Sequence, residues 1–160
     1  MKQIYLVTGI FSALLFLSGC SGTRVMHEKE KNRNTVDTFF DALENEDFDR
    51  LKVIFAEDAR QLNPYVPAGF PTVLDGNEAI YNQYSGLPEL FGNMSFPRTI
   101  IATEDPNLFF VTFRGEIDIK AGGRYENDYI GVFRLEDGKI IEYFNPIVMA
   151  KAFNISLDDS

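Results

Sequence analysis

The sequence predicts an α+β fold in which a curved antiparallel sheet wraps around three N-terminal helices. Apolar residues follow helical spacing up to about residue 91, whereas from residue 98 they alternate with polar residues. The second half also contains two turn signals, Gly122-Gly123 and Glu136-Asp137-Gly138, at which consecutive strands can reverse direction. Helices followed by a meander of strands are typical of a sheet with its helices on one face.

The N-terminus carries the pattern of a secretory signal. Lys2 precedes an apolar run over residues 4–17 that is too short to span a bilayer as a permanent helix. The run ends in Leu17-Ser18-Gly19-Cys20, which resembles the lipobox of bacterial lipoproteins. This resemblance implies cleavage before Cys20 and its lipidation, and two or more acyl chains anchor a protein stably. An ordinary signal peptide with an incidental cysteine is the alternative.

These features predict four segments and an address in the bacterial cell envelope. The segments are a signal peptide (1–19), Cys20 with a flexible polar tether (20–31), a folded domain (32–155) and a disordered acidic tail (156–160). Ser21 after the cysteine resembles the signal for outer-membrane retention. In a Gram-negative cell the protein is therefore expected at the periplasmic face of the outer membrane.

Composition excludes several classes of function. A net charge of −9 without a basic cluster argues against nucleic-acid partners and against electrostatic adhesion to anionic lipid. The only cysteine, Cys20, rules out intramolecular disulfides, and the only histidine, His27, falls in the tether. No metal-binding, phosphate-binding or dinucleotide-binding motif is present, so we expect no metal and no cofactor.

The first half predicts three helices. Asn34 is expected to cap the first, whose apolar positions Val36, Phe39, Phe40 and Leu43 lie on one side. Residues 45–47 end this helix, residues 48–55 form a second, and residues 60–62 form a brief strand. After an irregular loop (63–71), a third helix begins at residue 77 and can extend to 91 with a break at Pro88.

The second half predicts four strands, over residues 98–103, 108–120, 125–135 and 139–144. Pro146 is expected to open a short terminal helix over residues 147–153. A strongly twisted sheet of this kind curls around its helices and leaves a cone-shaped cavity. Such a cavity, lined by aromatic residues such as Phe113, is the expected small-molecule site.

Several stretches resemble the nuclear-transport-factor-2-like superfamily, which includes the SnoaL-like polyketide cyclases. The order of elements carries the resemblance, together with FAEDA after two helices and LDGNEAI at the third. TEDPNLFFV, RYENDYIGVFRLEDGKI and EYFNPIVMAKAFNI are most similar to the phenazine-biosynthesis A/B proteins. Membership implies a six-stranded curved sheet, a deep pocket, a sheet-to-sheet dimer and acid–base chemistry on a cyclohexenone-type intermediate.

The resemblance also assigns roles residue by residue. The family's catalytic glutamate matches Glu142, in the segment Glu142-Tyr143-Phe144-Asn145. The family's pocket histidine, serine and tyrosine fall on Gln83, Leu87 and Phe39, none of which can transfer a proton in the same way. Of the catalytic and pocket residues that the resemblance implies, this chain therefore keeps only the glutamate.

The sequence leaves the orientation of two carboxylates open. Glu142 shares its parity with apolar Ile140 and Phe144, which favours an inward side chain, but Ile141 and Tyr143 are apolar too. Asp128 belongs to a charged set that favours the outer face, with Arg114 or Lys120 as its partner across the sheet. Asn127 and Tyr129 would then supply the polar lining of the pocket.

The leading hypothesis is a membrane-anchored domain that binds a small apolar or aromatic molecule, with catalysis degraded or absent. One alternative is an isomerase or cyclase, neither a hydrolase nor metal-dependent, with Glu142 as acid–base and Gln83 and Tyr129 orienting the substrate. Another is a protein-interaction module or homodimer whose pocket is closed by aromatic side chains.

Overall fold

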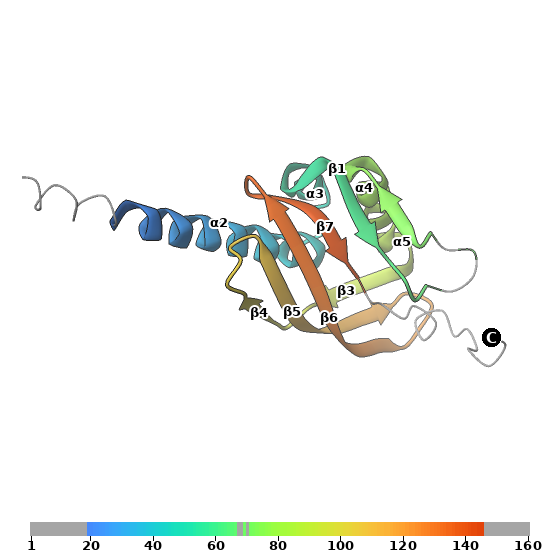
Figure 1. Cartoon of the computed structure of the whole chain (residues 1–160). Coiled ribbons are helices and arrows are strands. Elements are labelled where there is room, and N and C mark those ends of the chain that lie inside the picture. The colour runs from blue at the N-terminus through green and yellow to red at the C-terminus, as the bar shows by residue number, and fades with distance from the viewer. Residues whose placement is uncertain (1–18, 67–68, 70, 146–160) are drawn as a thin grey trace, which may run out of the picture.

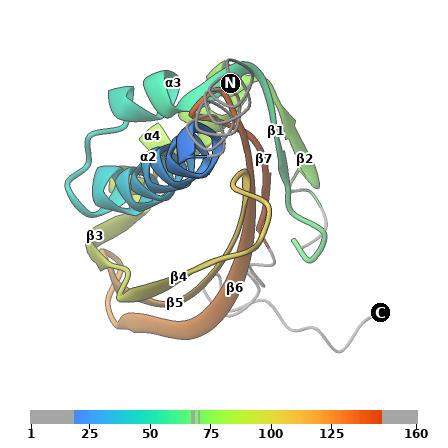
Figure 2. The same ribbon diagram turned by 60° about the vertical axis from the view of Figure 1, so that its left-hand side comes forward.

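The computed structural model describes residues 19–66, 69 and 71–145 of the chain. Within these residues, seven strands form one curved, open sheet that bends around the helices on its concave side (Figure 1, Figure 2). The strand order is β2-β1-β7-β6-β5-β3, and β4 pairs with β5 off this path. The predicted α+β architecture with a curved sheet is therefore confirmed.

The helices are α2 (Gly19–Glu44), α3 (Asp49–Ile54), α4 (Asn77–Ser85) and the single turn α5 (Leu87–Leu90). The second half of α2 lies in the concavity of the sheet, and its first turns project beyond the body of the domain (Figure 1). Val36, Phe39, Phe40 and Leu43 are all buried, as their spacing predicts. Glu46, with a φ of 55°, ends the helical path, so the predicted break at residues 45–47 is confirmed.

The beginning of α2 corrects the sequence prediction. Asn34 was expected to cap the helix, but it lies inside α2, which already begins at Gly19. Residues 20–31, expected to be flexible, are helical because they contain good helix formers and no proline. They lack apolar periodicity because residues 22–27 are exposed. At the end of this stretch Asn32 is buried and donates to the carbonyl oxygen of Pro106 at 3.0 Å.

The strands are β1 (Phe55–Leu62), β2 (Val73–Asp75), β3 (Phe91–Ser95), β4 (Arg98–Ala102), β5 (Leu108–Ile119), β6 (Arg124–Glu136) and β7 (Lys139–Phe144). The four strands predicted in the second half are confirmed. Strands β2 and β3 were missed because they are short, and only the first residue of β3, Phe91, fell within the predicted third helix. The strand predicted over residues 60–62 is the end of the longer β1. The sheet is mixed rather than antiparallel, since β1 runs parallel to β7.

The β5–β6 hairpin is the centre of the sheet, and β7 extends it. β5 and β6 pair continuously from Leu108↔Arg134 to Asp118↔Arg124. Between β6 and β7, Asp137 and Gly138 both have positive φ, 51° and 83°, as a two-residue hairpin loop requires. The strand–turn–strand unit predicted for residues 125–144 is therefore confirmed.

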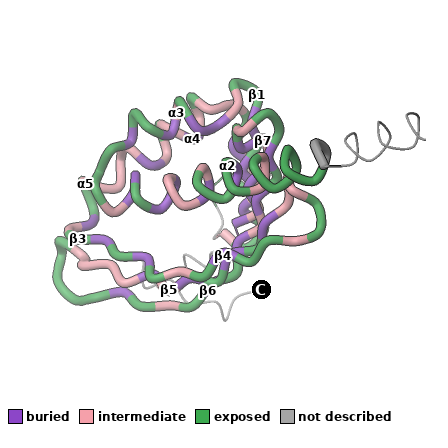
Figure 3. The backbone as a smooth tube through the Cα atoms, turned by 90° about the vertical axis from the view of Figure 1, so that its left-hand side faces the viewer, coloured by how far each residue is buried: buried purple, intermediate pink, exposed green. Residues whose placement is uncertain are grey.

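The core lies between the sheet and α2 and is largely aromatic. The ring of Phe39 lies 5.0–5.9 Å, between ring centroids, from the rings of five neighbours: Phe40, Phe55, Tyr84, Phe133 and Tyr143. Figure 3 shows buried backbone positions on the inner sides of the helices and strands, where they face one another. The same aromatic set forms part of the wall of the cavity described next.

Arg98 connects the edge of the sheet to α2 through ion pairs. Arg98 at the start of β4 pairs with three carboxylates on one side of α2, at distances of 2.6 Å for Asp37 and 3.1 Å for Glu44, and also with Asp41. Its guanidinium also lies 5.2 Å from the ring centroid of Phe40. The contact holds β4 over the helix and so closes the concavity on that side.

Candidate functional site: an uncharged cavity

A cavity of about 100 Å³ lies between the concave face of the sheet, α2 and the α4–α5 segment. This volume has room for several water molecules or a small organic molecule. Most of the wall is apolar, and its apolar residues are Phe39, Phe40, Leu43, Val66, Pro71, Leu87, Phe91, Met94, Phe96, Phe113 and Ile117. The cavity predicted from the curled sheet is therefore present.

The polar part of the wall consists of neutral groups. Four side chains are amides and four are phenols, namely Gln61, Asn63, Gln83, Asn145, Tyr84, Tyr125, Tyr129 and Tyr143. Among the described residues that line the cavity, none carries a carboxylate, ammonium, guanidinium or imidazole group. The wall can therefore form hydrogen bonds but offers no fixed charge to a ligand.

Tyr125 and Tyr129 form a pair on β6, with their hydroxyl groups in contact. The ring of Tyr129 stacks on Phe113 at 4.9 Å, and Gly115 lies beneath it, where a Cβ would come within 3.0 Å of the ring. Burial, followed by the contact with Tyr125, raises the pKa of Tyr129 well above the ordinary value for tyrosine. Tyr129 is thus a neutral hydrogen-bonding group rather than a source of phenolate.

Gln61, Asn63 and Asn145 form a second polar group, here called the amide cluster. Gln61 lies near the end of β1, Asn63 follows directly after β1, and Asn145 follows directly after β7. All three are buried, and Gln61 Nε2 donates to Asn63 Oδ1 at 2.9 Å. Nearby Tyr84 has a pKa raised by burial, an effect that contact with Gln61 partly offsets.

Tyr143 joins the cavity to the aromatic core. Its ring stacks on Phe133 at 4.2 Å with an interplanar angle of 11°, and burial raises the pKa of Tyr143. Gly131 leaves space for both rings, because a Cβ there would lie 3.0 Å from Tyr143 and 3.3 Å from Phe133. The lack of a side chain at Gly131 therefore allows both rings to pack close to β6.

Five of the residues predicted for the pocket lie in the wall of this cavity: Phe39, Gln83, Leu87, Phe113 and Tyr129. Two do not line it. Phe144 lies on the opposite face of β7 from Tyr143, and Asn127 is half-buried beside Tyr129 without reaching the lining. Whether any of these residues binds a ligand stays a prediction.

The inward orientation predicted for Glu142 is wrong. Glu142 does not line the cavity; its side chain is 39% exposed and lies 3.9 Å from Arg134. The cause is a β-bulge, since Glu142 pairs with Arg134 but Ile140 already pairs with Leu135, which leaves Ile141 as an extra residue. The bulge buries both Ile140 and Tyr143, so alternation counted from Ile140 gives the wrong face for Glu142.

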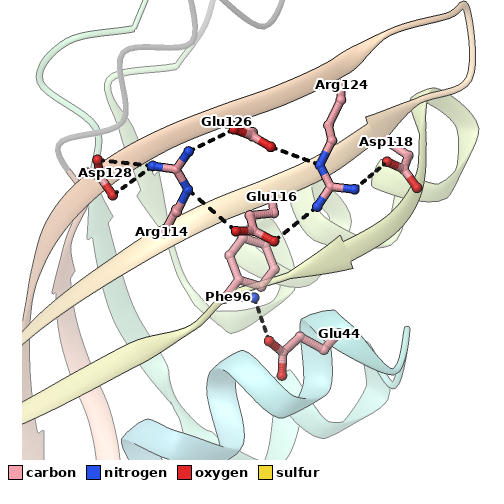
Figure 4. Close-up of polar contacts among 8 residues, drawn as sticks. All are labelled: Glu44, Phe96, Arg114, Glu116, Asp118, Arg124, Glu126 and Asp128. Carbon is pink, nitrogen blue, oxygen red and sulfur yellow. Dashed lines mark hydrogen bonds and ion pairs between the residues drawn. The ribbon is translucent and has the colours of Figure 1, made fainter.

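The outward orientation favoured for Asp128 is confirmed. Asp128 is exposed and lies 3.3 Å from Arg114, as the cross-strand pattern predicts. It belongs to a network of two arginines and four carboxylates on the outer face of β5 and β6 (Figure 4), formed by Arg114, Glu116, Asp118, Arg124, Glu126 and Asp128. No member of this network lines the cavity.

Other predictions fall largely outside the described residues. The side chain of Cys20, the terminal helix over 147–153 and the tail over 156–160 all lie there. His27 is an exposed residue of α2, remote from the cavity lining. Within the described ranges, no helix combines the length and apolarity needed to cross a membrane. The same part of the chain holds no group of three or more His, Cys, Asp or Glu suited to a metal ion.

Sequence reasoning missed most of the polar lining: Gln61, Asn63, Tyr84, Tyr125, Tyr143 and Asn145. Tyr125 was recoverable, since it shares the parity of Tyr129 on a regular strand. Gln61 and Asn63 were hidden because they border an irregular loop, and Asn145 because it follows the bulge. A polar residue at the end of a short strand belongs to no periodic pattern. The sequence therefore does not show whether such a residue lines a cavity or lies in a solvent-exposed turn.

The described residues thus form a curved sheet around a long helix, with an uncharged cavity between them. The match to known families is specific: residues 36–143 match the SnoaL-like domain. The chain therefore belongs to the SnoaL-like family and has the nuclear-transport-factor-2-like fold.

The relatives match about four fifths of the chain or more. The Bacillus subtilis protein YesE is 30% identical over 135 residues, covering 81% of this chain and 91% of that protein. Phenazine biosynthesis protein PhzA1 of Pseudomonas aeruginosa is 31% identical over 134 residues, covering 79% and 82%. The crystal structure of the phenazine biosynthesis-related protein PhzB2 from P. aeruginosa superposes with a TM-score of 0.70 at 24% identity, covering 88% and 96%. The predicted similarity to the phenazine A/B proteins is confirmed.

Proposed function

We propose that this protein binds a small, neutral, largely apolar ring compound in the cavity. The observation that carries the proposal is the chemistry of the described wall, which is aromatic and aliphatic with only amide and phenol groups added. An ionised ligand would lose its hydration there without meeting an opposite charge, and this desolvation is costly. A neutral ring loses little and gains contact with the aromatic wall.

Carboxylate-based isomerase or cyclase chemistry is not part of this proposal. The only glutamate that matches the family's catalytic position, Glu142, is on the outer face beside Arg134. Tyr84, Tyr129 and Tyr143 could donate a hydrogen bond to a ligand carbonyl, but burial raises the pKa of each, so they are poor bases near neutral pH. Binding is thus the activity that the geometry supports best.

A comparison of matched neutral and charged ligands tests the proposal. Acetophenone and benzoate have similar size, but only benzoate is ionised at pH 6.5. Titration of the full chain, followed by NMR or by thermal stabilisation, should show binding of acetophenone and at least tenfold weaker binding of benzoate. Equal or tighter binding of benzoate would contradict an uncharged site.

Two substitutions locate the binding. Leu87 lines the cavity on α5, so Leu87→Phe should occupy part of the volume and abolish acetophenone binding while the protein stays folded. Glu142→Gln removes the charge on the outer face and should leave the dissociation constant within about twofold, since single surface changes have small effects. Loss of binding in Glu142→Gln would restore the catalytic glutamate as a candidate.

We further propose that a lipid on Cys20 anchors the domain in the bacterial envelope. Support comes from the lipobox-like Leu17-Ser18-Gly19-Cys20 after an apolar run. The exposed turns of α2 that follow would act as a spacer between membrane and domain. Mass spectrometry of the membrane-extracted protein should find acyl chains on Cys20, and Cys20→Ala should release the protein from membranes. An unmodified cysteine in the membrane fraction would refute the anchor.

As a partner for the outer sheet face we propose a second copy of the chain. Ile101, Phe110 and Ile130 are exposed there at 47%, 39% and 56%. Ile101 pairs with Phe110 and Phe110 with Val132, so this apolar stripe crosses β4, β5 and β6. Burial of such a stripe is a common basis of association. Sedimentation should show a dimer that Phe110→Lys converts to a monomer; a monomeric wild type would end the proposal.

A further inference from the structure

Two buried acceptor atoms in the cavity wall lack a hydrogen-bond partner among the described residues. They are Gln61 Oε1 and Asn145 Oδ1. Gln61 is 2% exposed and Asn145 is 4% exposed, and both residues line the cavity. Buried polar atoms are nearly always hydrogen-bonded, so two unpaired acceptors beside one cavity indicate a missing donor.

The neighbours of Gln61 fix which end of its amide is unpaired. Asn63 Nδ2 donates to the carbonyl oxygen of Pro71 at a distance of 3.5 Å. A carbonyl oxygen can only accept a hydrogen bond, so the atom of Asn63 that faces it is the nitrogen. Asn63 therefore turns its Oδ1 toward Gln61, and Gln61 must present Nε2 to it. Reversing the amide would place two oxygens against each other. The free atom of Gln61 is consequently an oxygen, an acceptor that needs a donor.

The two acceptors lie side by side at the ends of two adjacent strands, Gln61 within β1 and Asn145 directly after β7. Gln61 pairs with Tyr143 in the parallel β1–β7 ladder, and the backbone N–H of Asn145 donates to the carbonyl oxygen of Leu62 at 2.8 Å. Gln61 and Asn145 are thus neighbours at the same end of the sheet. One hydroxyl or N–H group on a ligand could donate a hydrogen bond to the acceptors in this part of the wall.

The tyrosine pair offers the complementary group from a different strand. Two phenol hydroxyls have two hydrogens, and the contact between Tyr125 and Tyr129 uses one of them. The second hydrogen remains available for an acceptor, such as a ligand carbonyl. The cavity therefore presents acceptors at the end of β1 and β7 and a donor on β6.

From this arrangement we infer that the ligand is a neutral ring compound bearing a hydroxyl or N–H donor for the amide cluster and a carbonyl for the tyrosine pair. The inference rests on the proposed function and narrows it, because a plain hydrocarbon ring would leave both acceptors unpaired. A ring with a carbonyl alone would satisfy only the tyrosines. The donor group is thus the part of the ligand that this chain selects for.

Matched ligands separate this inference from the proposed function. The 3- and 4-hydroxyacetophenones are titrated into the full chain at pH 6.5, where they are neutral, beside their methoxy counterparts and acetophenone. The methoxy compounds keep the carbonyl and the ring but lack the donor. At least one hydroxyl isomer should bind about tenfold more tightly than its methoxy counterpart, as expected for one buried hydrogen bond. Because this comparison uses the unaltered protein, its result does not depend on whether any variant folds.

Substitutions then assign the preference to the acceptors. Gln61→Met and Asn145→Leu remove the oxygens at nearly constant volume, and together they should reduce the hydroxyl-to-methoxy preference to about one. Asn82→Leu makes a similar amide-to-apolar change at an exposed position of α4, outside the cavity wall, and should keep the preference. A further readout is the shift of the Gln61 and Asn145 side-chain amide NMR signals, expected with the hydroxyl ligands alone.

The outcomes are distinguishable. Binding of acetophenone with no preference for a hydroxyl group would leave the proposed function intact and overturn this inference. A preference that survives removal of both acceptors would also overturn it. If no ring compound binds, the proposed function fails and the inference fails with it.

Discussion

The two faces of the β5–β6 hairpin differ in chemistry although the same two strands form both. On the outer face, Arg114 and Arg124 pair with four carboxylates in one network (Figure 4). On the inner face, the alternate residues of the same strands are uncharged, and four of them line the cavity: Phe113, Ile117, Tyr125 and Tyr129. Each charged side chain of β5 or β6 that forms an ion pair does so on the outer face or at the edge of the sheet.

This difference explains why the cavity can select neutral ligands. Charges on the outer face are solvated and mutually paired, so their loss should cost little. Groups on the inner face are buried, so each must be apolar, hydrogen-bonded or matched by a ligand. The inner face should therefore be sensitive to small changes to which the outer face is tolerant.

Opposite substitutions on β6 should give the largest contrast. Phe133 is fully buried and stacks on Tyr143, so Phe133→Ala should reduce the free energy of unfolding by about 3–5 kcal/mol. Ile130, three residues away, is 56% exposed in the single chain but belongs to the stripe proposed for the dimer, so both variants are compared in the monomeric Phe110→Lys background. There Ile130→Ala should change the free energy of unfolding by less than about 0.5 kcal/mol. Urea denaturation measures the contrast. Similar losses in the monomer would contradict the difference between the two faces.

Alkaline pH should act through the buried tyrosines that line the cavity. Burial raises the pKa of Tyr84, Tyr129 and Tyr143 above the unfolded-state value of roughly 10. Below that pH these tyrosines leave stability unchanged. Above it the unfolded state releases protons that the folded state retains, so stability should fall by about 1 kcal/mol per tyrosine per pH unit.

Denaturation between pH 8 and pH 11 checks the alkaline prediction. Tyr143→Phe removes one of the three groups and should make the decline less steep. A stability curve that stays flat to pH 11 would show that these hydroxyls are solvated in the folded protein.

Adding one methyl group beneath the rings should have an intermediate effect. A Cβ on Gly131 would lie 3.0 Å from Tyr143, and one on Gly115 would lie 3.0 Å from Tyr129. Gly131→Ala and Gly115→Ala should each cost about 1–3 kcal/mol and reduce ligand binding, because the rings must move into the cavity. Gly92→Ala on β3 is the control, since its nearest neighbour, Asp118 Cβ, lies at 3.5 Å. Equal effects at Gly92 and Gly131 would mean that backbone freedom, rather than ring contact, decides.

Disrupting the outer ion network should have the smallest effect. Hydrogen bonding to Glu126 raises the pKa of Arg114, which keeps its charge at any practical pH. Arg114→Gln should reduce thermal stability less than any inner-face variant above, and added salt should shrink the difference, because exposed ion pairs are weak and screened. A large, salt-independent loss would show that the network is buried by a partner.

The sequence predicted the regular part of this contrast and missed the irregular part. Strict alternation along β5 and β6 placed Phe113 and Tyr129 inside and Asp128 outside, because nothing interrupts the pairing of these strands. Alternation failed on β7, where an extra residue at Ile141 moves Glu142 to the outer face. A bulge depends on how one strand fits its neighbour, and a single strand pattern does not contain that information.

The amide cluster was beyond prediction for a related reason. Gln61, Asn63 and Asn145 are far apart along the chain and meet only because β1 lies parallel to β7. This long-range pairing has no local signal, since the polar residues alone are typical of turns. Likewise, the early beginning of α2 was missed because a helix that is exposed on all sides has no apolar stripe to reveal it.

The measurement that tests the central claim most directly is the pH dependence of ligand affinity. Acetophenone does not ionise, so any change in its dissociation constant must come from the protein. Titrations of the full chain between pH 5 and pH 9 should give dissociation constants that agree within about twofold, because neutral amides and phenols line the described wall. A change of tenfold or more with a midpoint between pH 5 and pH 8 would mean that an ionisable group acts in the site, and would contradict the uncharged cavity.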